Sequence, residues 1–286
     1  MAAGVVHELA LPAGTLRLSV SAASDLGNVR KVNEDSFLAE PPLFLVADGM
    51  GGHSFGDRAS QSVVATFAAA VQGAALPTPE VIVQTIHDAN AKVIAMAEGD
   101  DGAVSGTTLS GLALVAVGTE PSHHWMAFNV GDSRVYSWDG RKLEQVTVDH
   151  SAVQELLDLG EISPLEASEH PHRNVVTRAI GVHDEVDPDI WLLPVGGSQV
   201  FLACSDGLSK ELDDDLIGDI LADRANLAEG QSVADRLVEA AIAAGGLDNV
   251  TVVVVESELV GSFHTVEEET SDRGIPNYLE ETRPRK

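Results

Sequence analysis

Carboxylates stand at the ends of several short apolar runs in this sequence. Asp48 and Asp206 each follow such a run, and Asp248 comes just before one. Strand ends that are far apart in the sequence can lie at one edge of an antiparallel sheet, so we expect these side chains to meet. Acids brought together repel one another unless cations neutralise them. Carboxylate and carbonyl oxygens, without paired His or Cys side chains, suit Mg²⁺ or Mn²⁺.

An Asp-Gly pair is also the commonest signal for a hairpin turn. The sequence holds 45 Asp+Glu, so some of them must fall at strand ends by chance. Neither Asp48-Gly49 nor Asp206-Gly207 is directly followed by another predicted strand, however. The pattern therefore favours a binding role for both pairs, because glycine beside a ligand lets the backbone carbonyl approach a metal closely.

The elements that must position these acids are short strands separated by helices. Only residues 131–133 separate two of the strands, so we predict that those two form an antiparallel hairpin with Asp132 in its link. Glu34 and Asp35 precede the first predicted strand. This order predicts an α+β fold in which largely antiparallel sheets are covered by helices. The predicted strands span 43–47, 109–117, 125–130, 134–138, 199–203 and 250–255, and the predicted helices lie at 59–71, 82–96, from 213 onward and at 233–244.

The excess of acidic over basic residues excludes some classes of function. The 286 residues carry 17 Lys+Arg against 45 Asp+Glu, a formal net charge of −28. So acidic a chain lacks the basic surface that nucleic acids and anionic lipids require, and its apolar runs are too short to span a bilayer. We therefore expect no nucleic-acid partner and no membrane insertion. Its one cysteine, Cys204, can form no intrachain disulfide and its first residues do not resemble a signal peptide, which together predict a cytoplasmic protein.

The domain organisation is simple. We predict one domain over residues 1–258, because no stretch rich in Pro or Gly divides it. Residues 259–286 lack apolar periodicity and are predicted to form a disordered acidic tail. Thr265 and Thr270 of this tail lie in an acidic context that could recruit a kinase or a phosphothreonine-binding domain, although a solvated tail is the simpler interpretation.

Seven segments, in order along the chain, resemble the metal-dependent serine/threonine protein phosphatases of type 2C, the PPM family, and in particular their compact bacterial branch. The resemblance runs from about Thr15 to Glu256. One Asp-Gly pair would be a weak signal, but the ordered set is specific. The segments are RKVNEDS (30–36), LVADGMGGH (45–53), SGTT (105–108), NVGDSRVY (129–136), the stretch 149–181, CSDGL (204–208) and GLDNVTVVVV (246–255).

The resemblance implies a fold and a metal centre. The fold would be a four-layer α-β-β-α sandwich, two antiparallel sheets flanked by helices, with the metals in a cleft at one edge. Asp48 would bridge two Mn²⁺ or Mg²⁺ ions. The carbonyl of Gly49 would bind one of these ions, and Asp206 and Asp248 would bind the other.

Further roles follow from the same resemblance. Glu34 would act through bound water, with Asp35 supporting the ligands from behind. Asp132, with Asp206, would hold a third and weaker ion. Arg30 would bind the phosphate, because its planar guanidinium can donate to two oxygens at once. A surface salt bridge is the simpler alternative for this arginine.

The activity implied is hydrolysis of phosphoserine and phosphothreonine in proteins, through a water or hydroxide activated by the dinuclear centre. The partners implied are phosphorylated proteins, including a Ser/Thr protein kinase and its substrates. Residues 151–183 resemble the flap beside the cleft, and the apolar spacing of Val153, Leu156 and Leu157 fits an ordinary packed helix equally well.

One departure from the family pattern concerns the proton donor. Some members carry a histidine two residues after the bridging aspartate, whereas this chain has Met50 there. A metal-bound water, His53 and His150 remain alternatives for protonating the leaving alcohol. For the two histidines, structural hydrogen bonding is the favoured interpretation.

Two rival functions stay open at this point. A non-catalytic binding or sensor module could use the same scaffold, but every position matched to a metal ligand is filled, which argues against it. A phosphohydrolase acting on small metabolites is the second rival, and it differs in substrate rather than in chemistry.

Overall fold

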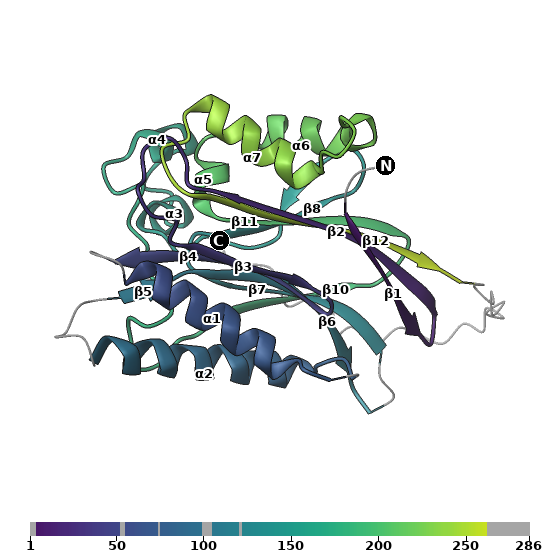
Figure 1. The fold of residues 1–286 in the computed structure, drawn as a ribbon. Helices are drawn as coiled ribbons and strands as arrows, with labels where there is room; N and C mark the ends of the chain where they lie inside the picture. Colours follow the sequence, from purple (N-terminus) through teal and green to yellow (C-terminus); the bar gives the residue numbers. More distant parts are fainter. Residues whose placement is uncertain (1–3, 52–54, 74, 99–104, 120–121, 262–286) are drawn as a thin grey trace, which may run out of the picture.

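The computed structural model describes residues 4–51, 55–73, 75–98, 105–119 and 122–261. Two antiparallel sheets face each other, and each is covered on its outer side by a pair of helices (Figure 1). The predicted four-layer sandwich is therefore confirmed. The predicted tail lies outside the described residues from position 262 onward, as does His53.

The first sheet has six strands, and every neighbouring pair in it is antiparallel. Its central strand β12 carries the valine-rich run that the sequence predicted, because a strand buried on both faces is apolar at successive positions. In spatial order the strands are β1 (Val5–Leu11), β2 (Gly14–Asp25), β12 (Val250–Val260), β11 (Ser198–Cys204), β8 (Arg134–Trp138) and β9 (Leu143–Gln145).

The second sheet is built in the same way, and its strands are also antiparallel. A short strand, β5 (Ser105–Thr107), pairs with the end of β4. The main strands, in spatial order, are β10 (Asp189–Pro194), β7 (Ser122–Val130), β6 (Leu109–Val117), β4 (Leu43–Gly51) and β3 (Asp35–Glu40).

Several helices begin at a residue whose side chain caps them. Asp213 caps α6 by accepting from the backbone of Leu216, and Ser232 and Asp235 form a capping box at the start of α7. The helices are α1 (Gly56–Ala70), α2 (Pro79–Glu98), α3 (Ala152–Asp158), α4 (Pro164–Glu169), α5 (Asp206–Ser209), α6 (Asp214–Ala222) and α7 (Val233–Ala244), with a 3₁₀ turn at Arg224–Asn226.

Three apolar cores hold the layers together. One lies between α1, α2 and the second sheet, and includes the stacked rings of Phe67 and Phe128. Another lies between the first sheet and α6 and α7. The third fills the space between the two sheets, around Trp125 and Phe201. Each sheet is thus buried on both faces, which explains the continuous apolar runs in its central strands.

The predicted hairpin at residues 131–133 is wrong. β7 pairs with β6 and β10 in one sheet, whereas β8 pairs with β11 and β9 in the other. Gly131 has a φ of 116°, a conformation that favours glycine, and the chain crosses there between the sheets. A short link excludes a parallel pair, but it also permits a crossing between two facing sheets. Asp132 therefore lies where the sheets are joined.

The start of the fold also differs from the prediction. Three strands, β1 to β3, precede the run that was expected to be first, and Asp35 lies within β3 rather than before a strand. β4 continues to Gly51, so Asp48 lies inside the strand and not after its end. β1 and β3 show only a weak apolar pattern, whereas β2 alternates buried Leu16, Leu18 and Val20 with polar residues, a signal from which periodicity could have predicted it.

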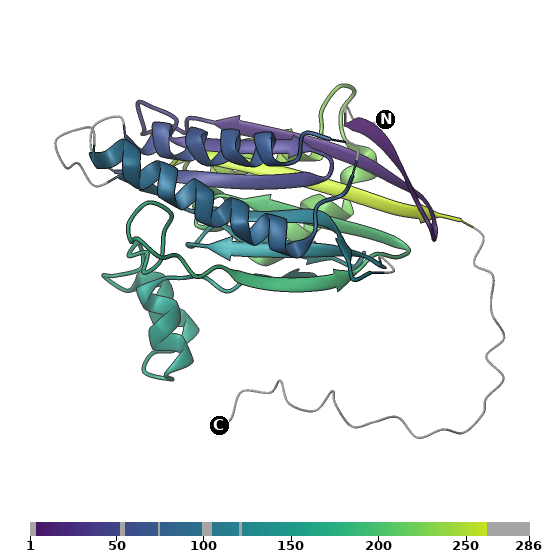
Figure 2. The same cartoon turned by 90° about the horizontal axis from the view of Figure 1, so that it is seen from below.

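The helices α3 and α4 stand apart from the sandwich (Figure 2). They lie within residues 151–183, the segment that was predicted to be a flap, and they contact each other more than the sheets. No helix in the described part of the chain has the length and apolar character needed to cross a membrane.

Candidate metal centre

Asp48 and Asp35 face each other across two neighbouring strands. The register of β3 and β4 makes them direct partners. Thr108 fixes the backbone of Asp48 from the other side: its Oγ1 accepts from the Asp48 amide at 3.0 Å, and its amide donates to the Asp48 carbonyl at 2.9 Å. The SGTT segment thus positions the central carboxylate through backbone contacts.

Gly49 lies where no side chain could fit. A Cβ there would overlap the carbonyl oxygen of Gly56 and lie 2.6 Å from that of Glu34. The Gly49 amide donates to the Glu34 carbonyl at 3.1 Å. This packing brings the backbone of Gly49, the residue Glu34 and the start of α1 together beside Asp48.

Asp206 and Asp35 are linked through Ser205. Asp206 is the first residue of α5, directly after β11, so the strand end and the helix start place it together. The Ser205 hydroxyl donates to Asp35 Oδ2 at 2.8 Å and accepts from the Thr251 amide at 2.9 Å. A carboxylate of one sheet is thereby fastened to the strand ends of the other.

Asp248 lies just before β12 and carries an ion pair. Arg30 Nη2 donates to Asp248 Oδ2 at 2.6 Å, and the Arg30 side chain is 48% exposed. The side chain of the neighbouring Asn249 holds the loop that bears Arg30. Its Nδ2 donates to the carbonyls of Leu26 at 2.9 Å and Val32 at 3.1 Å. Its Oδ1 accepts from the backbone amide of Glu34 at 2.9 Å.

Asp132 approaches from the crossing between the sheets and is 6% exposed. Lys210, one helical turn after Asp206, forms an ion pair with Asp206 Oδ2. Burial alone would lower the pKa of Lys210, but the charges of Asp206, Asp132 and Asp48 outweigh it and raise this pKa. Lys210 therefore stands among the same carboxylates.

Burial and mutual repulsion raise the pKa values of the acids in the cluster. Burial, followed by the charge of Asp35, raises the pKa of Asp48 well above its ordinary value. Burial also raises the pKa of Asp35 and that of Asp132 to about 7 each, with further increases from neighbouring carboxylates. Burial raises the pKa of Glu34, although Arg30 opposes the shift. The cluster predicted from strand ends is thus present in the fold.

The residues fit divalent cations. Asp35 Oδ1 and Asp206 Oδ1 are covered by protein and have no hydrogen-bond partner, which is costly for an ionised oxygen without a cation. No group of three or more His, Cys, Asp or Glu side chains among the described residues is already spaced to hold an ion. Arg30 occupies Asp248 Oδ2 and Lys210 occupies Asp206 Oδ2, whereas Asp206 Oδ1 has no hydrogen-bond partner and stays available to an ion.

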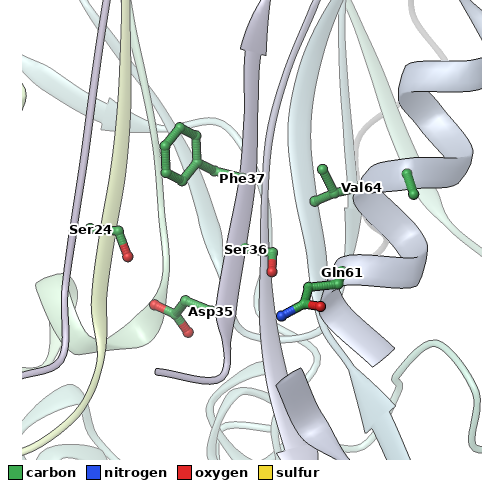
Figure 3. Close-up of a pocket in the computed structure, with 7 residues that line it drawn as sticks. Ser24, Asp35, Ser36, Phe37, Gln61 and Val64 are labelled. Carbon is green, nitrogen blue, oxygen red and sulfur yellow. The ribbon is translucent and has the colours of Figure 1, made fainter. Parts of the chain in front are cut away.

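A cavity of about 350 Å³ adjoins this cluster without containing it. It opens between β2, β3 and α1, where Ser24, Phe37 and Gln61 line it together with Asp35 (Figure 3). Asp35 is the one predicted metal-site residue among its lining residues. The acids therefore come together in the charged cluster and not in this cavity.

His150 has a structural position. Its Nδ1 accepts from the Gly131 amide at 3.0 Å, and its Nε2 faces Arg178 Nη1 at 3.1 Å and Asp189 Oδ2 at 3.4 Å. The ring therefore connects the crossing at residue 131 to Arg178 near the end of the flap segment and to Asp189 at the start of β10. The preference for hydrogen bonding over proton donation is consistent with these contacts, and Met50 offers no donor group.

Sequence reasoning missed two residues of this site. Asn249 joins both ends of the Arg30 loop, and its only signal was its place beside Asp248. Lys210 is not among the residues that the sequence predicted for this site. Its spacing of four residues from Asp206, which places both on one face of a helical turn, could have revealed it.

Comparison with known proteins decides the family. A family profile described as "Protein phosphatase 2C" matches residues 29–240. The chain belongs to the protein phosphatase 2C family. The resemblance seen in the sequence is thereby confirmed, and the chain is a metal-dependent serine/threonine phosphatase.

Individual relatives of this phosphatase are bacterial. The serine/threonine phosphatase stp of Listeria monocytogenes is 38% identical over 82% of this chain and 94% of its own length. The serine/threonine protein phosphatase PstP of Mycobacterium tuberculosis is 38% identical over 85% of this chain, which spans 45% of that relative. The solved catalytic domain of a PstP in complex with two manganese ions has a TM-score of 0.74 and 35% identity, covering 85% of this chain and 99% of the solved one.

Proposed function

We propose that this phosphatase holds two Mn²⁺ or Mg²⁺ ions between Asp48, Asp206, Asp248 and the carbonyl of Gly49. Glu34 and Asp35 complete the site, Glu34 through water and Asp35 by supporting its neighbours. The observation that carries the proposal is the convergence of carboxylates from both sheets with two covered oxygens that lack hydrogen-bond partners. Oxygen donors of this kind are the ligands that hard divalent cations prefer.

The chemistry divides between ions and protein. Divalent ions, when bound, acidify a coordinated water and neutralise charge on the phosphate. The protein contributes fixed carboxylates: Thr108 holds Asp48 by its backbone, and Ser205 holds Asp35. Such preorganisation means that the site need not rearrange its own dipoles as the phosphate reacts.

Arg30 is the proposed phosphate ligand. Its guanidinium lies at the edge of the cluster, half-exposed, on a loop held by Asn249. A guanidinium can donate two parallel N–H groups to two phosphate oxygens, which orients the phosphate as well as neutralising it. In the contacts described here Arg30 binds Asp248, so substrate binding requires it to exchange that carboxylate for the phosphate.

We propose phosphoserine and phosphothreonine in proteins as substrates, with a Ser/Thr protein kinase as the opposing enzyme, and a cytoplasmic location for both. The names of the bacterial relatives support the substrate class. The protruding flap α3–α4 stands beside the sandwich where a protein substrate could contact it. A small-metabolite phosphohydrolase remains the rival in substrate, and a non-catalytic module the rival in class.

One experiment separates these functions. We expect Mn²⁺-dependent release of phosphate from a phosphothreonine peptide, with much slower release from a sugar phosphate and none in excess EDTA. Asp206→Ala should abolish the activity, whereas Asp215→Ala, an exposed acid at the start of α6, should retain it. Activity that survives EDTA would contradict the metal assignment. Faster turnover of the sugar phosphate would contradict the protein-substrate assignment.

A further inference from the structure

Lys210 is a basic residue placed inside the acidic cluster by the fold. It caps α5, and its amide donates to the Asp206 carbonyl at 2.8 Å, which completes one helical turn. That turn brings Nζ onto Asp206 Oδ2. The position of the ammonium is thus set by the same short helix that presents the candidate metal ligand.

The second carboxylate near this ammonium is that of Asp132. Asp132 is 6% exposed and lies in the crossing between the sheets, where both of its neighbours in the chain form hydrogen bonds. Gly131 donates to His150 Nδ1 at 3.0 Å, and the Ser133 hydroxyl contacts that of Thr108 at 2.7 Å. Asp132 is near enough to Lys210 and Asp206 for their charges to act on it. Asp132 and Asp206 are the two residues that were expected to hold a third ion.

We infer that Lys210 is the permanent cation of the Asp132–Asp206 pair and excludes a third divalent ion, so that this chain binds two ions. The inference rests on the proposed function, because it presupposes the two-ion centre. It revises the expectation of a third ion. A divalent cation at these carboxylates would have to displace an ammonium already bound to one of them, or tolerate its repulsion at short range.

An ordinary surface ion pair would not have this effect, and the exposures distinguish the two cases. The Lys210–Asp206 side chains are 38% and 13% exposed. Those of Lys142 and Glu144, a pair of the same chemistry, are 71% and 61% exposed. Water screens the second pair on all sides, whereas the first shares its surroundings with buried carboxylates that few other charges compensate.

The test counts bound manganese in the full chain. Wild type, Lys210→Met and Lys210→Arg are titrated with Mn²⁺ by calorimetry, and bound ions are counted by electron paramagnetic resonance. Wild type should bind two ions and Lys210→Arg two, because arginine keeps the charge. Lys210→Met should bind a third ion, at least about tenfold more tightly than any third ion detected in wild type.

Lys142→Met is the matched control, since it changes the net charge by the same amount at an exposed site that is distant from Lys210 in the sequence. It should bind two ions with wild-type affinity. A rise in ion number in this control equal to that in Lys210→Met would overturn the inference, because general electrostatics would then explain both.

The thermal midpoint gives a second readout that does not depend on activity. In EDTA, Lys210→Met should melt below both wild type and Lys142→Met, because Asp206 loses its counter-charge. Saturating Mn²⁺ should raise its midpoint by more than it raises that of wild type. Wild type and Lys210→Met that bind equal numbers of ions, with equal affinity, would overturn the inference while leaving the two-ion proposal standing. Wild type that binds no Mn²⁺ would overturn both.

Discussion

Asp48 is a central carboxylate of the cluster, and the strongest influences on its pKa all oppose its ionisation. It is surrounded by Asp35, Asp206, Asp132 and Asp248, and burial adds to their repulsion. Such a carboxylate weakens the metal-free fold and becomes favourable only with a cation nearby. Its cost to stability and its value to the reaction therefore have the same origin.

A single substitution can separate these two effects. Asp48→Asn keeps the shape of the side chain and removes its charge, so in EDTA at pH 7.5 we expect a thermal midpoint equal to or above that of wild type. The midpoint should gain little from Mn²⁺, and phosphatase activity should fall by roughly 10³-fold or more, the scale of losing an electrostatic element of an active site. Asp215→Asn is the control. A metal-free Asp48→Asn that melts well below wild type would contradict this account.

Asn249 acts through the loop it holds. Asn249→Ala leaves the carbonyls of Leu26 and Val32 and the amide of Glu34 without partners, at a cost of about 2–4 kcal/mol in unfolding free energy. Because Arg30 lies on this loop, the KM for a phosphopeptide should rise more than kcat falls. Asn226→Ala, which removes an exposed hydrogen bond to Asp223, should change neither constant. An unchanged KM in Asn249→Ala would show that the loop does not need this anchor.

At the scale of elements, two junctions decide where the acids lie. The step from β11 into α5 presents Asp206, and the crossing from β7 to β8 presents Asp132. Both junctions are tightly packed around glycine. A Cβ at Gly207 would overlap the Asn249 carbonyl, and a Cβ at Gly131 would lie 2.7 Å from that of Thr108. Glycine at these positions therefore lets the segments that carry Asp206 and Asp132 pack closely against the neighbouring chain.

The junction between β11 and α5 predicts whether a glycine-to-alanine substitution stabilises or destabilises the fold. Alanine normally stabilises a helix over glycine by up to about 1 kcal/mol, yet Gly207→Ala should lower the unfolding free energy by about 1–3 kcal/mol because of the backbone overlap. It should also weaken Mn²⁺ binding, since Asp206 precedes it directly. Gly196→Ala, where a Cβ would meet no atom within 4 Å, should change stability by less than about 0.5 kcal/mol. A stabilised Gly207→Ala would contradict the packing argument.

The crossing junction provides a pH dependence through His150. Burial, and then the charge of Arg178, lowers the pKa of His150 in the fold, although Asp189 and Asp149 oppose the shift. Between the ordinary pKa of about 6.5 and this lower value, the unfolded chain binds a proton that the fold rejects. Stability should therefore be lost as pH falls below about 6.5.

The comparison is between wild type and His150→Gln across pH 5.0–8.0, at fixed saturating Mn²⁺. The difference in unfolding free energy should favour wild type less as the pH falls, because only wild type carries the buried imidazole. The exposed His87→Gln should follow wild type at every pH. Parallel curves for wild type and His150→Gln would show that this histidine does not titrate as described.

At the scale of the whole molecule, the cluster joins the two sheets. Asp35 and Asp48 belong to one sheet, Asp206 and Asp248 flank strands of the other, and Asp132 lies in the crossing. Apolar packing between the sheets holds the rest of this interface. Cations bound at the edge would therefore link the two halves of the sandwich and stabilise the fold as a unit.

This link should depend on pH in a defined direction. Because the pKa values of Asp35 and Asp132 are raised to about 7 in the metal-free fold, its stability should fall as pH rises from about 4 to about 7, as these buried groups ionise. Metal binding needs the ionised carboxylates, so the gain from Mn²⁺ should grow over the same range. The midpoint difference between Mn²⁺ and EDTA should be large at pH 7.5 and small at pH 5.5. An equal difference at both values would contradict it.

The sequence by itself determined the composition of the layers and of the site. Continuous apolar runs predicted the central strands, helical spacing predicted the covering helices, and the Asp-Gly pairs at 48 and 206 with Asp248 identified the cluster. These features were readable because each depends on neighbours within a few residues. The edge strands β1 and β3 were missed, since their half-exposed positions leave only a weak apolar pattern.

Only the tertiary structure decided how the sheets are joined and which cations face which acids. The link at residue 131 reads as a hairpin from its length, and only the pairing of β7 and β8 with different sheets shows a crossing. In the same way, Arg30 and Asp248 meet across 218 positions of sequence. Contacts of that kind depend on how whole sheets pack against each other. They cannot be inferred from the propensities and spacing of residues that are close in the sequence.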